Sequence, residues 1–168
     1  MHLESRLRRD GAKNCLSDRS RGSKVQGIIN IIVADDHPVV LSGVRMVLSG
    51  HTDLRMVATA CDSTEVVERL ARVPCSVLVT DDAMPGGEYG DGVPYLAFLR
   101  ECFPDLKIIV FSMNGDPDLR RSLARIGVHS LILKSADVGE LVSAIRNTQC
   151  VLGQPLQLQL ATFGCYFC

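Results

Sequence analysis

The chain has 168 residues and a formal net charge of −1, which predicts a single domain of ordinary size with tails. Hydrophobic residues make up 46% of it, but no apolar run approaches the roughly 20 residues of a membrane-spanning helix. Residues 1–26 carry a charge of +4 and residues 27–168 a charge of −5. The acidic main part argues against direct nucleic-acid binding. We expect a cytoplasmic protein without a signal peptide or membrane contact.

Strand and helix patterns alternate from residue 28 to residue 147. Short runs rich in Val, Ile and Leu are typical of strands buried on both faces of a parallel sheet, and segments with helical spacing of apolar residues separate them. The expected strands are 28–35, 54–60, 76–80, 107–111 and 130–133, and the expected helices are 38–49, 64–72, 93–102, 117–126 and 138–147. Repeated βα units of this kind predict an α/β fold with a doubly wound parallel sheet.

Single residues predict some of the helix ends. Pro38 suits the first position of the helix that follows the first strand. Ser63 is expected to cap the next helix at its N-terminus. Gly127 is expected to end the helix that begins near Pro117.

The two ends of the chain lack the alternating pattern. Residues 1–26 are rich in Ser, Arg and Gly without periodicity, which predicts a disordered basic tail. Residues 149–168 are expected to form a linker or a truncated tail, too short for another domain. The seven cysteines are scattered and odd in number, as expected for free thiols, and the single pair Cys165 and Cys168 is a weak metal or redox signal.

Polar residues gather at the carboxyl ends of the expected strands. In chain order they are Asp35, Asp36, Asp81, Asp82, Ser112 and Lys134. Ligand sites in open α/β sheets form outside these strand ends, so the side chains should share one rim. Clustered carboxylates repel one another unless a cation intervenes, which indicates a hard divalent ion such as Mg²⁺. One carboxylate would remain free to attack phosphorus and form an acyl phosphate.

Several motifs over residues 27–148 resemble the receiver domain of two-component response regulators. They are Ala34-Asp35-Asp36-His37-Pro38, Thr80-Asp81-Asp82-Ala83-Met84-Pro85-Gly86, Phe111-Ser112-Met113 and Leu133-Lys134. Residues 34–43, 89–92 and 108–114 are most similar to NarL/FixJ-type receivers, and among these to the capsule-synthesis regulators of the Rcs phosphorelay. The resemblance implies a flavodoxin-like (βα)5 sheet with strand order 2-1-3-4-5.

The resemblance also implies a role for each strand-end residue. Asp81 would be the phosphoacceptor, and Ser112 and Lys134 would hold the transferred phosphoryl group. The implied ligands of Mg²⁺ are Asp35, Asp36 with direct contact, Asp81 and the backbone carbonyl of Ala83.

A sensor histidine kinase or a histidine phosphotransfer protein is the implied phosphoryl donor. The implied output is transcription regulation through the surface of residues 117–147, with a homodimer as one form of it. The domain would then be a regulatory phosphoacceptor that catalyses only its own phosphorylation and dephosphorylation. Regulators of the NarL/FixJ type carry a DNA-binding helix-turn-helix. The segment of about 20 residues after the last expected helix is too short to form one.

Three positions depart from the usual receiver pattern. Asp82 stands where the family usually has an apolar residue, and it would either perturb the site or face solvent. Leu131 replaces a frequent aromatic switch residue, and Ser135 replaces a frequent proline.

Two other functions remain as alternatives. A receiver-like module that binds partners without phosphorylation would suit these departures. A Mg²⁺-dependent phosphohydrolase would need a second aspartate as general acid two residues after Asp81, where Ala83 stands. His37 is a further candidate ligand or phosphate carrier, although its place before Pro38 favours a local structural role.

Overall fold

The computed structural model describes residues 27–149. The expected basic tail, nearly all of the expected C-terminal segment and the Cys165/Cys168 pair lie outside these residues. In the described part of the chain, no helix combines the length and the apolar character needed to cross a membrane.

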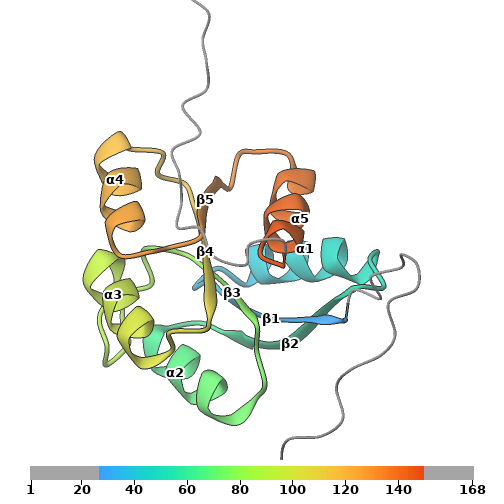
Figure 1. Cartoon of the computed structure of the whole chain (residues 1–168), viewed down its shortest axis with the longest axis horizontal. Helices are drawn as coiled ribbons and strands as arrows, with labels where there is room; N and C mark the ends of the chain where they lie inside the picture. Colours follow the sequence, from blue (N-terminus) through green and yellow to red (C-terminus); the bar gives the residue numbers. More distant parts are fainter. Residues whose placement is uncertain (1–26, 150–168) are drawn as a thin grey trace, which may run out of the picture.

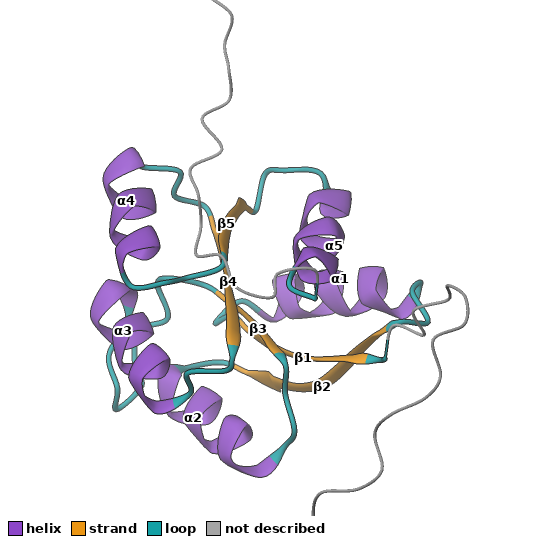
Figure 2. Cartoon of the chain, in the orientation of Figure 1, coloured by secondary structure: helices purple, strands orange, loops and turns teal. Residues whose placement is uncertain are grey.

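Strands and helices alternate without exception, as the sequence predicts (Figures 1 and 2). The strands are β1 (Ile29–Ala34), β2 (Leu54–Ala60), β3 (Val77–Thr80), β4 (Lys107–Ser112) and β5 (Ser130–Leu133). The helices are α1 (Pro38–Ser49), α2 (Ser63–Arg72), α3 (Gly92–Cys102), α4 (Pro117–Arg125) and α5 (Val138–Asn147). All strand pairs are parallel and the order is β2-β1-β3-β4-β5. The predicted doubly wound α/β fold and strand order are therefore confirmed.

Two apolar layers cover the two faces of the sheet. Helices α1 and α5 lie on one face, and α2, α3 and α4 lie on the other (Figure 1). Along β1, Ile31 and Val33 pack in the α1/α5 layer, whereas Ile32 and Ala34 pack in the opposite layer. Because successive residues of a strand point to opposite faces, a strand covered on both sides must be apolar throughout.

The strand register brings the carboxyl ends of the strands to one rim. Ala34 pairs with Thr80 across β1 and β3, and the backbone N–H of Asp81 donates to the Ala34 carbonyl at 2.9 Å. Ser112 pairs with Leu133 across β4 and β5, and Lys134 N–H donates to the Ser112 carbonyl at 2.8 Å. Asp35 and Asp81 are thereby level, and Lys134 stands two residues further along, at the same edge of the sheet.

The N-terminus of α2 differs from the sequence-based expectation. The cap is Asp62, whose carboxylate accepts the Glu65 N–H at 2.9 Å, and Ser63 is already the first residue of the helix. Ser63 is fully buried and its hydroxyl accepts the Tyr89 N–H at 3.3 Å, so it bonds to a distant loop and not to its own helix. Gly127 does follow α4 as predicted, with a φ of +77° that favours glycine.

Replacing Asp62 by alanine removes the acceptor for the Glu65 N–H and should lower the free energy of unfolding by about 1 kcal/mol. Asp91→Ala is a matched control, because Asp91 precedes α3 without a side-chain capping bond, and we expect a smaller loss there. Urea unfolding followed by circular dichroism measures both. Equal losses in the two variants would contradict a capping role for Asp62.

Candidate functional site

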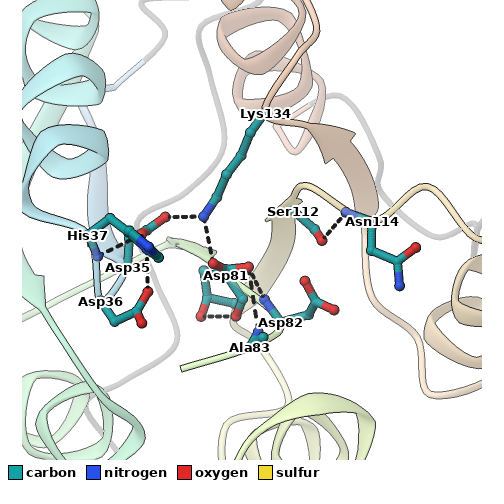
Figure 3. A network of polar contacts seen from close by, with 10 residues as sticks. Asp35, Asp36, His37, Asp81, Asp82, Ala83, Ser112, Asn114 and Lys134 are labelled. Atoms are coloured by element: carbon teal, nitrogen blue, oxygen red, sulfur yellow. Dashed lines mark hydrogen bonds and ion pairs between the residues drawn. The ribbon is translucent and has the colours of Figure 1, made fainter. Parts of the chain in front are cut away.

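Asp81 lies at the centre of the rim, directly after β3 (Figure 3). It is 7% exposed. Its Oδ1 accepts the Asp82 N–H at 2.8 Å and lies 3.5 Å from the Ala83 nitrogen. Its Oδ2 accepts from the Lys134 ammonium at 2.5 Å. The carboxylate is thus held by its own backbone on one side and by a cation on the other.

Lys134 bridges two buried carboxylates. Its Nζ lies 2.5 Å from Asp81 Oδ2 and 2.6 Å from Asp35 Oδ2. Burial by itself lowers the pKa of Lys134, but the hydrogen bonds to Asp35 and Asp81 outweigh it, and the net pKa is raised. The ammonium therefore stays charged at neutral pH, and its contribution to stability is lost only as the pH rises through the raised pKa.

Asp35, Asp36, His37 and Asp81 form a compact group that fits a metal ion. Each offers one ligand atom, and these atoms all lie within 4.8 Å of one another. The buried Oδ1 of Asp36 accepts no hydrogen bond within residues 27–149, and only the His37 ring lies against it, with Nδ1 at 2.6 Å. An oxygen-rich set of this kind suits a hard divalent cation.

His37 takes a larger part in this group than its place at a helix start suggests. Its backbone N–H donates to Asp35 Oδ1 at 2.9 Å. Its ring Nδ1 also lies 3.2 Å from the same oxygen. The sequence signal was the position directly after two acidic residues, since a side chain there can fold back on both carboxylates.

Ser112 is the last residue of β4 and is 1% exposed. Its hydroxyl oxygen accepts the Asn114 N–H at 2.8 Å. Asn114 was not among the expected site residues. Its contribution is a backbone N–H, which any residue but proline supplies, so the sequence carries no signal for it.

Asp82 lies on the other side of Asp81 from the metal-binding group. In Figure 3 its carboxylate points toward Ser112 and Asn114, away from Asp35 and Asp36. Burial raises the pKa of Asp82, the nearby Ser112 hydroxyl opposes the rise, and the neighbouring Asp81 adds to it. Asp82 is half-buried, so the side chain neither faces solvent fully nor joins the metal-binding group.

Ala83 is exposed and two residues beyond Asp81. The loop around it is tied to two helices: Gly92 N–H donates to the Asp82 carbonyl at 2.7 Å, and Glu88 N–H donates to Thr64 Oγ1 at 2.8 Å. These bonds fix the path of the chain after Asp81. The role of the Ala83 carbonyl as a metal ligand stays a prediction.

Comparison with protein families matches residues 31–146 to the response regulator receiver domain. The chain belongs to this family. The resemblance drawn from the strand-end motifs is thereby confirmed, and the domain has the regulatory role of the family. The polar rim described above lies where ligand sites form in sheets of this kind.

Curated relatives place the chain beside the NarL/FixJ-type regulators. It is 36% identical over 121 residues to the transcriptional regulatory protein RcsB of Salmonella typhi, covering 72% of this chain and 56% of that protein. It is 36% identical over 118 residues to the oxygen regulatory protein NreC of Staphylococcus carnosus, covering 70% of this chain and 54% of that protein. The chain thus spans about half the length of the curated relatives it matches.

Solved structures agree with this assignment. The isolated receiver domain of RcsB from Salmonella enterica serovar Typhimurium, in the presence of the phosphomimetic BeF3⁻, matches with a TM-score of 0.72 and 32% identity, covering 79% of this chain and 95% of that one. RcsB from the same source bound to the promoter P1flhDC matches with a TM-score of 0.69 and 34% identity, covering 73% of this chain and 60% of that one.

Replacing Lys134 by methionine should destabilise the domain in Mg²⁺-free buffer by about 2–4 kcal/mol, because two buried carboxylates lose their shared counter-ion. Adding Mg²⁺ should restore part of this loss, since a bound cation stabilises the folded state. Thermal unfolding with and without Mg²⁺ measures both effects. Lys107→Met, at the opposite end of β4, is the control, and an unchanged midpoint for Lys134→Met would contradict the bridging role.

Proposed function

We propose that Asp81 accepts a phosphoryl group from a histidine-phosphorylated partner protein. The observation that carries this proposal is the pairing of Asp81 with Lys134 at 2.5 Å, beside a group of ligand atoms that fits a divalent cation. A carboxylate oxygen of Asp81 would attack phosphorus while the P–N bond of the phosphohistidine breaks and the imidazole leaves with the electron pair. The product is an acyl phosphate on Asp81.

Mg²⁺ is the cofactor that this donor set suits. Asp35, Asp36, Asp81 and the Ala83 carbonyl would hold it, and the ion would supply positive charge for the phosphoryl oxygens. The chain's own residues orient the acceptor. The Asp82 N–H binds Oδ1 of Asp81 at 2.8 Å, which leaves the carboxylate in one fixed orientation.

Lys134 and Ser112 would hold the phosphoryl oxygens. Lys134 already contacts the acceptor carboxylate and is the residue that follows β5. Ser112 is joined to Lys134 through the backbone, because the Lys134 N–H donates to the Ser112 carbonyl at 2.8 Å. Both would donate to the negatively charged phosphoryl oxygens, and such charge-assisted hydrogen bonds are strong.

A change at these two residues reaches a defined surface. Ser112 ends β4 and precedes the connection to α4, while Lys134 follows β5 and precedes the connection to α5. Phosphorylation would therefore shift the population of the surface formed by α4, β5 and α5, as a ligand shifts a two-state equilibrium. Position 131 in β5 carries a leucine, so an aromatic side-chain flip at that position has no part in this mechanism.

The partner and the output follow from the relatives. The phosphoryl donor is a sensor histidine kinase or a histidine phosphotransfer protein. RcsB is named as a transcriptional regulatory protein, and one of its structures contains two dimers bound to DNA. We propose transcription regulation as the output of this chain too, with a homodimer as the activated form and without direct nucleic-acid contact by residues 27–149.

Incubation with acetyl phosphate and Mg²⁺ should add one phosphoryl group to the wild-type chain and none to Asp81→Asn, because the amide cannot form the acyl phosphate. Intact-protein mass spectrometry under non-acidic conditions measures the gain. Asp91→Asn removes the same charge from an exposed position of the same loop and should be labelled like the wild type. A wild-type chain that stays unlabelled, or label that survives in Asp81→Asn, would refute the assignment and favour a phosphorylation-independent binding module.

A further inference from the structure

Asp82 is the one carboxylate of the rim that faces away from the metal-binding group. The ligand atoms of Asp35, Asp36, His37 and Asp81 gather within 4.8 Å, and the Asp82 carboxylate lies on the other side of Asp81 (Figure 3). Its charge is therefore directed at the place where the proposed phosphoryl group and Ser112 would meet.

The backbone of Asp82 is held on both sides. Its N–H donates to Asp81 Oδ1 at 2.8 Å, and its carbonyl accepts the Gly92 N–H at 2.7 Å. With the backbone fixed, the half-buried side chain has few orientations left. Its place beside Ser112 is thus set by the fold and not by a free surface rotation.

The hydroxyl of Ser112 has one proton to give. A serine hydroxyl offers one O–H donor and two acceptor lone pairs. The Asn114 N–H already uses an acceptor position at 2.8 Å, and the Asp82 carboxylate points toward this hydroxyl (Figure 3). The Asp82 carboxylate and a phosphoryl oxygen on Asp81 would therefore compete for the same proton.

We propose that Asp82 is a positioning residue that holds the Ser112 hydroxyl in the resting state and competes with the phosphoryl group for it. This inference rests on the proposed function of Asp81. The competition has two parts. The carboxylate occupies the only proton of Ser112, and its negative charge repels the incoming phosphoryl oxygens. Both parts make the resting arrangement harder to leave than in a chain with an apolar residue at this position.

The two ligands of the site should respond to Asp82 in opposite ways. Removing a negative charge favours an anion and leaves a cation unaffected or less tightly bound. Asp82→Asn should therefore bind the phosphomimetic BeF3⁻ about tenfold more tightly in the presence of Mg²⁺, an effect of the size expected for neighbouring charges near a protein surface. Its affinity for Mg²⁺ alone should not increase. A variant that merely loosens the fold would bind both ligands less tightly.

Titration of BeF3⁻ by tryptophan-independent methods, such as isothermal calorimetry or NMR, measures this change, because the chain contains no tryptophan. Asp91→Asn is the matched charge control in the same loop and should leave the BeF3⁻ affinity unchanged. Asp82→Ser provides a second neutral variant in case the asparagine does not fold, and it should also bind BeF3⁻ more tightly. Unchanged or weaker BeF3⁻ binding in a folded Asp82 variant overturns the inference.

A double-mutant cycle with Ser112→Ala tests whether Asp82 acts through Ser112. If it does, the gain from Asp82→Asn should fall to less than about threefold in the alanine background, where only charge repulsion remains. An equal gain in both backgrounds overturns the positioning role. Failure of the proposed function gives a different result, because a wild-type chain that binds no BeF3⁻ with Mg²⁺ and gains no label at Asp81 would fail before Asp82 is changed.

Discussion

A single ammonium group, that of Lys134, lies within ion-pair distance of two buried carboxylates, those of Asp35 and Asp81. The three residues follow β1, β3 and β5, so their contact requires the carboxyl ends of these strands to lie along one edge of the sheet. Two like charges in a poorly solvated place cost free energy unless a cation is shared between them. The arrangement of the rim depends on this contact, because without it Asp35 and Asp81 would repel each other.

The fold was predictable because strands that are buried on both faces of a sheet have continuous apolar sequences. Ile31 and Ile32 of β1 face opposite layers, and both are fully buried, so the apolar run is continuous and short. The N-terminus of α2 was less predictable. Asp62 and Ser63 are both good capping residues. The Ser63 hydroxyl instead accepts a hydrogen bond from the Tyr89 N–H, which lies 26 residues further along the chain.

The same reasoning separates the predictable part of the site from the rest. Asp81 and Lys134 were predictable because strand ends converge by topology, whatever the side chains do. The direction of the Asp82 side chain was not predictable, because the sequence does not show which way a side chain next to Asp81 turns. The path of the loop after Asp81 was not predictable either. A side chain at Gly87 would collide with Ser63, so the close contact between this loop and α2 requires a glycine that the sequence alone does not distinguish from its neighbours.

The rim carries four carboxylates, Asp35, Asp36, Asp81 and Asp82, against the one ammonium of Lys134. Such an excess of negative charge attracts a divalent cation but repels a negatively charged phosphoryl group. A carboxylate that contacts the cation offsets this repulsion by binding positive charge. Asp82 lies outside the group of ligand atoms that fits a metal, so its charge is not offset in this way. In the proposed mechanism, the balance between resting and phosphorylated states therefore depends on Ser112, whose one proton would go either to Asp82 or to the phosphoryl group.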